Sequence, residues 1–180
     1  NNGGGGGSGA GSGSGGGESV PGGPAVTSFS VMPTSIAEPD TAIFTAMVTD
    51  PDGLDDIVGG TLLGVDGQSY GPFVQISGGT YSLSITGGGI SDVQPVDFGT
   101  KSKRGFRGEF TDTAQKVGWK TVDLEFVSCT IDNQCTLKPR CVDGVCGDCA
   151  SNNDCGAANP VCSTVSHECV ECETADDCCT

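Results

Sequence analysis

Eleven cysteines are the residues of this chain best able to do chemistry, and all of them lie between Cys129 and Cys179. Thiols at this density form disulfides, bind zinc or take part in redox exchange. Almost no other core-forming residues accompany them, which favours disulfides and therefore an oxidising compartment. Residues 1–128 contain no cysteine, so that part of the chain must be stabilised in another way.

The spacing of the cysteines repeats along the chain. The words CTIDNQC, CASNNDC and CETADDC stand at the same place in three successive units, and the chain end is expected to cut the third unit short. In that unit two cysteines are adjacent, so their pairing stays open. The units of four, four and three cysteines are Cys129, Cys135, Cys141 and Cys146; Cys149, Cys155, Cys162 and Cys169; and Cys172, Cys178 and Cys179.

Zinc is the alternative to disulfides, because two CxxC pairs have a zinc-type spacing. The pairs Cys146-x2-Cys149 and Cys169-x2-Cys172 are separated by 19 residues, which meets the C-x2-C…C-x2-C pattern. The repeat accounts for every spacing, whereas zinc accounts for four positions, so we predict disulfides. A redox-active CxxC is a further alternative, but no βαβ pattern surrounds it. Each four-cysteine unit can close two bridges in three ways, and each bridge is worth about 2–4 kcal/mol.

The segment DPDGLDD at residues 50–56 is a candidate calcium site, since Ca²⁺ prefers oxygen ligands. Its spacing is not that of an EF-hand, because Gly53 comes too early and Thr61 occupies the place of the bidentate glutamate. The alternative is a solvated loop without a metal, in which Pro51 and Gly53 form the turns. No other cofactor is predicted. The four carboxylates of the segment are Asp50, Asp52, Asp55 and Asp56.

No catalytic set emerges, and we expect a protein that is not an enzyme. His167 is the only histidine, and a Ser/His/Asp set would have to recruit it from among the cysteines. The glycine run at residues 87–89 is not expected to lie between a strand and a helix, so it does not predict a phosphate-binding loop.

Two other features are candidates for binding. The basic stretch KSKRGFR at residues 101–107 is interpreted as a solvated loop that offsets nearby acids, or as a surface for an acidic patch on a neighbouring subunit. Trp119 and Tyr81 could form a platform for stacking sugars, but single aromatic residues at strand ends usually belong to a core or its rim.

The charge of the chain excludes some partners. Its formal net charge is −15, and such an acidic surface repels nucleic acids and anionic lipid headgroups. No apolar run approaches the roughly 20 residues that a membrane helix needs. No signal peptide is visible, and we expect Asn1 to be a mature end left by processing. Protein partners or self-assembly are expected, with membrane attachment only through a lipid anchor ahead of Asn1.

The chain divides into three segments with different compositions. Residues 1–24 have the glycine-rich and serine-rich composition of a flexible tether, which either lifts a domain off a surface or becomes ordered against a neighbouring subunit. Residues 25–128 are expected to form a β-sandwich. Residues 129–180 are the cysteine repeats, with units at 129–146, 149–169 and 172–180 and little regular secondary structure.

The sandwich is predicted from short β-favouring runs separated by turn residues. In the run at 41–49, Ala42, Phe44, Ala46 and Val48 share one face. Asp66-Gly67 is a hairpin turn pair. Seven strands in about 100 residues, with no helical periodicity, fit an immunoglobulin-like sandwich that holds by apolar packing alone. The runs lie at 25–31, 41–49, around 61–65, and at 72–77, 81–86, 106–112 and 120–127.

Two resemblances add to this interpretation. The stretches SVMPTSIAEPDTAIFTAMVTDPDGLDDI, TYSLSIT and FTDTAQKVGWKTVDL resemble bacterial extracellular immunoglobulin-like domains over residues 25–128, which implies a fold and a location but no chemistry. The stretch CTIDNQCTLKPRCVDGVC resembles the cysteine-rich repeats of predicted surface lipoproteins of myxobacterium-like bacteria. That resemblance implies a lipid anchor on a cysteine just before Asn1.

We therefore expect a non-enzymatic, secreted or outer-surface bacterial protein with a structural or adhesive role. One alternative is the protomer of an extracellular filament with an ordered glycine-rich tail. Another is a carbohydrate-binding or protein-binding module attached to a larger secreted protein.

Overall fold

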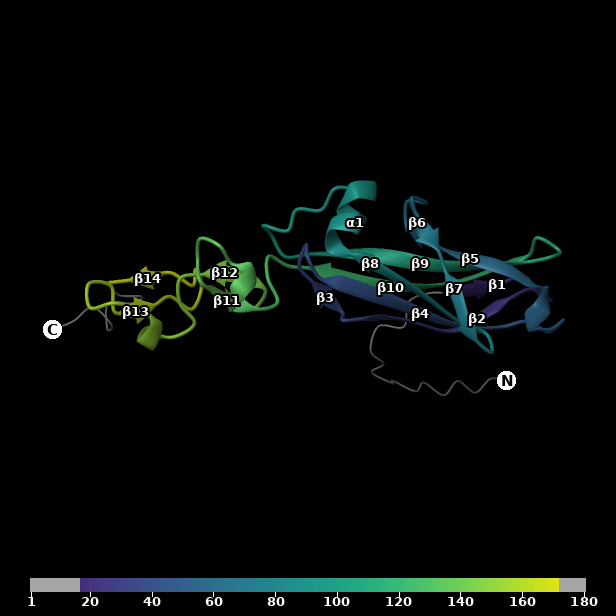
Figure 1. Ribbon diagram of the computed structural model, residues 1–180, viewed down its shortest axis with the longest axis horizontal. Helices are drawn as coiled ribbons and strands as arrows, with labels where there is room; N and C mark the ends of the chain where they lie inside the picture. The colour runs from purple at the N-terminus through teal and green to yellow at the C-terminus, as the bar shows by residue number, and fades with distance from the viewer. Residues whose placement is uncertain (1–16, 172–180) are drawn as a thin grey trace, which may run out of the picture.

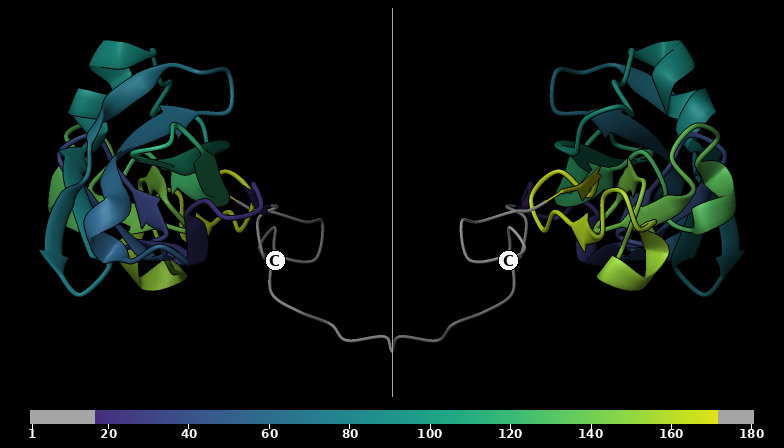
Figure 2. Two further views of the ribbon diagram at one scale, coloured as in Figure 1. Left: turned by 90° about the vertical axis from the view of Figure 1, so that its right-hand side faces the viewer. Right: turned by 90° about the vertical axis from the view of Figure 1, so that its left-hand side faces the viewer.

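The computed structural model describes residues 17–171, and the earlier glycines, Cys172, Cys178 and Cys179 lie outside the described residues. A β-sandwich is followed by two small cysteine-rich units, and the three bodies lie in a row (Figures 1 and 2). The mostly β fold class is therefore confirmed. We call residues 129–171 the stalk.

The first sheet of the sandwich is antiparallel and has the strand order β2-β4-β8-β7. Strand β4 lies in its centre, with Phe44 opposite Val31 of β2 and Leu83 of β8. The sheet contains β2 (Ala25–Met32), β4 (Thr41–Thr49), β7 (Val74–Ser77) and β8 (Thr80–Thr86).

The second sheet has the order β1-β10-β9-β5-β6, and the short strand β3 pairs in parallel with the end of β10. The order β2-β4-β8-β7 facing β10-β9-β5-β6 is that of an immunoglobulin sandwich, in which strands A-B-E-D face G-F-C-C′. The sheet contains β1 (Gly17–Ser19), β3 (Ser35–Ile36), β5 (Ile57–Gly64), β6 (Ser69–Pro72), β9 (Ser102–Asp112) and β10 (Val117–Phe126).

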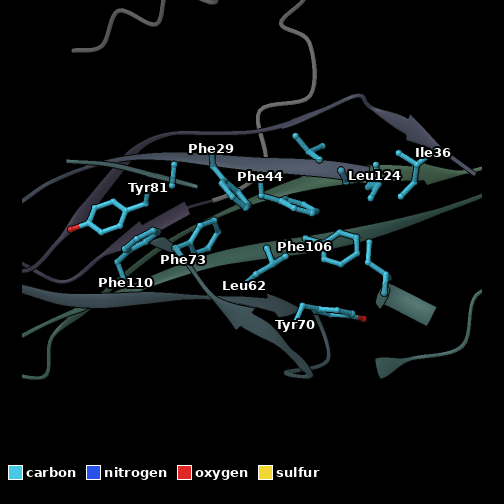
Figure 3. Packing of buried hydrophobic residues seen from close by; sticks show 14 of the residues in the cluster. Phe29, Ile36, Phe44, Leu62, Tyr70, Phe73, Tyr81, Phe106, Phe110 and Leu124 are labelled. Carbon is cyan, nitrogen blue, oxygen red and sulfur yellow. The ribbon is translucent and has the colours of Figure 1, made fainter. Parts of the chain in front are cut away.

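The core between the sheets consists of aromatic and aliphatic side chains (Figure 3). Phe106 lies near its centre, with ring centroids of Phe44 and Tyr70 each 5.1 Å away. The alternation predicted for residues 41–49 is confirmed, because Ala42, Phe44, Ala46 and Val48 are all buried. Since no described disulfide lies within the sandwich, apolar packing must stabilise it.

The expectation of no helix was wrong at the glycine run. Helix α1 (Gly87–Val93) follows β8 directly, and Thr86 caps it by accepting a hydrogen bond from the Gly89 N–H at 3.0 Å. A Cβ on Gly87 would lie 2.6 Å from the Ala37 carbonyl oxygen, so a glycine is needed for this close approach. Ile90 then anchors the helix in the core. The glycines thus form the first turn of a helix of only seven residues.

Two strand boundaries also differ from the predictions. Strand β9 begins at Ser102, so most of the basic stretch 101–107 is a strand and not a loop. Its residues pair in regular register with β10 from Ser102↔Phe126 to Thr111↔Val117. Strand β1 lies in the segment expected to be a tether, where Glu18 pairs with Trp119. The hairpin turn is as predicted, with Gly67 at φ 88° between β5 and β6.

Small elements complete the described chain. The 3₁₀ turn η1 (Leu54–Asp56) lies in the acidic loop between β4 and β5. No helix among residues 17–171 has the length and apolar character needed to cross a membrane. The stalk contains two 3₁₀ turns, η2 (Asp132–Gln134) and η3 (Asn152–Asp154), and two hairpins, β11 (Arg140–Val142) with β12 (Val145–Gly147) and β13 (Val161–Cys162) with β14 (Cys169–Val170).

Candidate functional site

The stalk is the most distinctive feature of the structure, and its eight described cysteines form four disulfides. Both units use the same connectivity, first to third and second to fourth cysteine, which the spacing had left open. Each bridge closes a short loop with a sequence separation of 11 to 14 residues. The bridges are Cys129–Cys141, Cys135–Cys146, Cys149–Cys162 and Cys155–Cys169.

The same hydrogen bonds recur at equivalent positions of the two units. The residue before the second cysteine, Gln134 or Asp154, accepts the two backbone N–H groups that follow the first cysteine. The residue two positions earlier, Asp132 or Asn152, accepts the N–H of the third cysteine at 2.7 and 2.8 Å. These side-chain acceptors satisfy backbone donors in segments that have almost no sheet or helix.

The hairpin of each unit returns to the start of the unit. The Gly144 carbonyl oxygen accepts the Ser128 N–H at 2.8 Å, and the His167 carbonyl oxygen accepts the Asp148 N–H at 2.7 Å. Both acceptors lie two residues before the fourth cysteine and have positive φ, 84° for Gly144 and 54° for His167. These contacts of the only histidine use its backbone, so His167 has a structural place in the second hairpin.

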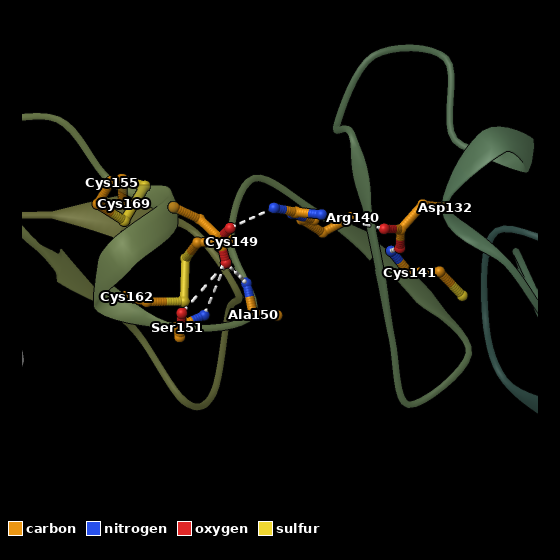
Figure 4. Close-up of polar contacts among 10 residues, drawn as sticks. Asp132, Arg140, Cys141, Cys149, Ala150, Ser151, Cys155, Cys162 and Cys169 are labelled. Atoms are coloured by element: carbon orange, nitrogen blue, oxygen red, sulfur yellow. Dashed lines mark hydrogen bonds and ion pairs between the residues drawn. A yellow bond between two sulfur atoms is a disulfide. The ribbon is translucent and has the colours of Figure 1, made fainter.

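Ion pairs join the two units, and Figure 4 shows the pair made by Arg140. The Arg140 guanidinium of the first unit lies 3.2 Å from Asp132 of its own unit and 2.5 Å from Asp154 of the second unit. Lys138 of the first unit contacts Glu168 of the second at 2.6 Å. Exposed pairs contribute little energy singly, but two pairs together with short covalent loops favour one relative orientation of the units.

The carboxylates at this contact have perturbed pKa values. Hydrogen bonds from the backbone N–H of Ala150 and then from Arg140 lower the pKa of Asp154 below its usual 3.8. Hydrogen bonds from the Cys141 N–H and then from Arg140 lower the pKa of Asp132 in the same way. A lowered pKa in the folded state stabilises that state above the usual pKa, and this stabilisation is lost as the pH falls through the folded pKa. The Arg140–Asp154 pair between the units is therefore expected to weaken below about pH 3.8. Lys138 lowers the pKa of Glu168 from its usual 4.5, so the second pair is expected to weaken below about pH 4.5.

An NMR titration of the Cys141 and Ala150 amide protons is expected to show midpoints below 3.8 for the two carboxylates that accept from them. Arg140→Gln should raise both midpoints, but not fully to the ordinary value, because the amide hydrogen bonds are the larger cause and persist. Lys138→Gln is the matched control, because Lys138 contacts Glu168 and contacts neither Asp132 nor Asp154. A midpoint at or above 3.8, or one insensitive to Arg140→Gln, would contradict this assignment.

The first unit is also joined to the sandwich. Asp40, in the loop between β3 and β4, accepts hydrogen bonds from Thr130 at 2.8 Å and from Gln134 at 2.7 Å. Val127, directly after β10, is buried, and a Cβ on Gly144 would lie 2.7 Å from its side chain. Cys129 is fully buried at the same junction. The stalk therefore leaves the sandwich through a packed and hydrogen-bonded junction.

The structure describes three of the four cysteines of the alternative zinc set. Cys146, Cys149 and Cys169 belong to three different disulfides, and Cys172 lies outside the described residues. A disulfide sulfur is not the thiolate that zinc binds. The structure agrees better with crosslinks than with this zinc set.

The acidic loop brings three of its four carboxylates together. Asp50, Asp52 and Asp56 each offer one oxygen within 4.8 Å of the others, whereas Asp55 is outside this group. The Asp50 carboxylate accepts the Asp52 N–H at 2.9 Å, and Thr113 donates to the Asp56 carboxylate. Hydrogen bonds therefore hold the first and the last carboxylate of this group, those of Asp50 and Asp56, in place.

The basic stretch is engaged within the sandwich. Lys101 lies 3.4 Å from Glu125, and Arg107 lies 3.0 Å from Glu109. The Arg104 guanidinium donates to the carbonyl oxygens of Gln94 and Pro95, at 3.0 Å each. These contacts support the interpretation that the stretch offsets nearby acids, although it does so from a strand.

The two aromatic residues considered for sugar stacking do not form a platform. Tyr81 is buried, with its ring 4.9 Å from that of Phe110, and burial raises the pKa of its hydroxyl. Trp119 is half-buried on β10, with the Arg107 guanidinium 5.6 Å from its ring. A shallow groove of about 600 Å³ in the stalk, lined in part by Ser163 and His167, has polar and apolar walls in similar amounts.

The outer face of the sheet β2-β4-β8-β7 was not singled out from the sequence. None of the residues in these four strands is charged, although the chain has a net charge of −15. Met32 pairs with Ile43 across β2 and β4, and Met47 follows farther along β4. Val74 and Ile76 lie on the edge strand β7. These five side chains are 45–65% exposed, and we call them the neutral face.

A comparison of the chain with models of protein families gives no match, and a comparison with curated proteins gives none either. What the structure supports is therefore the coarser statement: a sandwich of two antiparallel sheets followed by a cysteine-rich region with four disulfides. Those disulfides fit an oxidising environment.

Proposed function

We infer that this chain is a non-enzymatic structural or adhesive protein of the cell exterior, in which the stalk holds the sandwich at a fixed distance and orientation. The observation that supports this inference is the stalk itself. It has two units of the same connectivity, ion pairs between them and a hydrogen-bonded junction to the sandwich at Asp40. Such a stalk transmits position and force, and disulfides of this kind persist outside the cytosol.

The two ends of the sandwich differ. We call the end that joins the stalk the attached end and the opposite end the presented end. The junction lies where β10 ends, and the acidic loop and the β9–β10 turn lie at the opposite end of the sandwich (Figure 1).

Surface exposure on cells that produce the chain tests this inference. Intact cells are treated with a membrane-impermeant lysine reagent, and the modified chain is quantified by mass spectrometry, with a cytosolic protein as control. We expect labelling of the exposed Lys101 in intact cells and no labelling of the control. Labelling of Lys101 only after lysis would contradict an exterior location.

The neutral face favours a second candidate, the protomer of an extracellular filament. Copies of a chain with a charge of −15 repel one another across most surfaces, and an uncharged face with exposed Met32, Ile43 and Met47 avoids that repulsion. We expect concentration-dependent assembly in analytical ultracentrifugation that Met47→Glu abolishes. Val58→Glu is the control, because Val58 is 67% exposed on the other sheet. A wild-type chain that stays monomeric at high concentration would exclude the filament.

A further inference from the structure

Two buried carboxylate oxygens lack a partner at the presented end of the sandwich. Oδ2 of Asp50 and Oδ2 of Asp112 are shielded from solvent and accept no hydrogen bond within the described residues. Asp112 is fully buried, and its other oxygen accepts the Lys116 N–H at 2.7 Å. A buried carboxylate oxygen without a partner is strongly unfavourable, so these atoms need an explanation.

The strand alternation aims both carboxylates into the space between the sheets. Asp50 follows β4 and continues the inward row that ends with Ala46 and Val48. Asp112 is the last residue of β9 and continues the inward row of Phe110. Because β4 and β9 belong to opposite sheets, the two side chains approach this end of the core from opposite sides.

Hydrogen bonds hold the end of β9 against the acidic loop. The Thr113 N–H donates to the Asp56 carbonyl oxygen at 2.9 Å, and the Thr113 hydroxyl donates to the Asp56 carboxylate. Asp112 is also paired with Ile57, the residue that follows the loop. The fully buried Asp112 therefore lies beside the backbone that anchors Asp56, although its oxygens are not part of the group formed by Asp50, Asp52 and Asp56.

The spacing of the loop carboxylates fits one hard cation. Two oxygens that share a Ca²⁺ ion at about 2.4 Å each lie at most about 4.8 Å apart. The oxygens of Asp50, Asp52 and Asp56 satisfy this limit for every pair. Three carboxylates so close together repel one another without a cation, and one of these residues, Asp50, also carries an oxygen without a hydrogen-bond partner.

We propose that the loop at residues 50–56 binds Ca²⁺ through Asp50, Asp52 and Asp56, with the Asp112 carboxylate adding negative charge from the core side. Asp55 is not a ligand. The ion neutralises the buried charge and fixes the loop that joins the two sheets. Ca²⁺ would thus stiffen the presented end of the sandwich, and this inference stands whether or not the chain is an adhesive protein.

Thermal melts of the full chain after treatment with EDTA test the site, with CaCl₂ or MgCl₂ added at matched ionic strength. At a Ca²⁺ concentration 100 times the Kd, Tm should rise by about 10 °C or more. Mg²⁺ should give a much smaller rise, because it demands a stricter octahedral geometry. Isothermal titration calorimetry should show one bound Ca²⁺ per chain. The absence of a calcium-dependent shift and heat in the wild-type chain would overturn the proposal.

Two variants that each remove one negative charge distinguish calcium binding at a specific site from a general screening of the chain's charge by calcium. Asp50→Asn should lose the calcium-dependent shift, and without calcium its Tm should not fall, because a buried unpaired charge has been removed. Asp55→Asn is the matched control in the same loop and should keep the full shift. Equal loss in both variants, or a full shift in Asp50→Asn, would contradict the assigned ligands.

Discussion

Replacing Cys149 and Cys162 by serine is expected to unfold the second stalk unit and leave the sandwich folded. Cys149 is fully buried and Cys162 nearly so, and the unit has few other buried side chains. Opening a loop of this length costs about 3 kcal/mol, which is comparable to the whole stability that so small a unit can have. The unit cannot compensate by packing.

Hydrogen exchange measures this outcome residue by residue. In the double variant, the amides of Ala150 and Ser151, which donate to Asp154, should exchange at the rate of an unfolded chain. The Val48 amide, which donates to Gly79 in the sandwich, should remain protected. Val165→Ser is the control, because Val165 is 88% exposed in the same unit. Retained protection of Ala150 in the double variant would show that the bridge does not hold the unit.

Phe106→Ala is expected to destabilise the sandwich by about 3–5 kcal/mol. Phe106 is fully buried, and its ring lies within 6.4 Å of those of Phe44, Tyr70 and Phe126. No disulfide constrains the unfolded state of this part of the chain. The loss is therefore a large share of the 5–15 kcal/mol typical of a domain.

Urea denaturation followed by the fluorescence of Trp119, the only tryptophan, measures the free energy of unfolding of the sandwich. Val58→Ala is the control, since Val58 is 67% exposed and should change the stability by less than about 0.5 kcal/mol. A loss below about 1 kcal/mol for Phe106→Ala would mean that the core is not packed as the structure has it.

The sequence predicted the parts of the fold that depend on local periodicity. The alternation of Ala42, Phe44, Ala46 and Val48 identified a half-buried strand, because the side-chain period of a strand is two. The cysteine spacing identified two similar units. It could not choose among the three pairings of each unit, because connectivity depends on how the hairpins fold back onto Ser128 and Asp148.

The errors arose where tertiary contacts outweigh local preference. Glycine disfavours helices, yet Gly87 begins α1 because its missing side chain lets the helix approach the Ala37 carbonyl. Lys103 and Arg104 are in a strand because β10 supplies a complete pairing partner. The basic character of the stretch suggested a loop, but Lys103 lies on the exposed face of an antiparallel strand, where charged residues are readily tolerated. Arg104 lies on the other face and donates to the carbonyl oxygens of Gln94 and Pro95.

The stalk contacts had only a partial signal in the sequence. Gln134 and Asp154 stand at the same place before the second cysteine, so a shared role as backbone acceptors was open to prediction. Arg140 had no such signal, since its partner Asp154 lies in the next unit. Asp112 also had no signal in the sequence, because its carboxylate is buried only when the two sheets pack against each other.

Peptide mapping of the natively purified chain, without reduction and after alkylation in denaturant, tests most directly whether crosslinks hold the stalk. We predict no alkylation at the eight cysteines from Cys129 to Cys169, and linked peptides for Cys129–Cys141, Cys135–Cys146, Cys149–Cys162 and Cys155–Cys169. Full alkylation of these thiols, or bound zinc that is released as they are alkylated, would contradict both the stalk and the exterior location built on it.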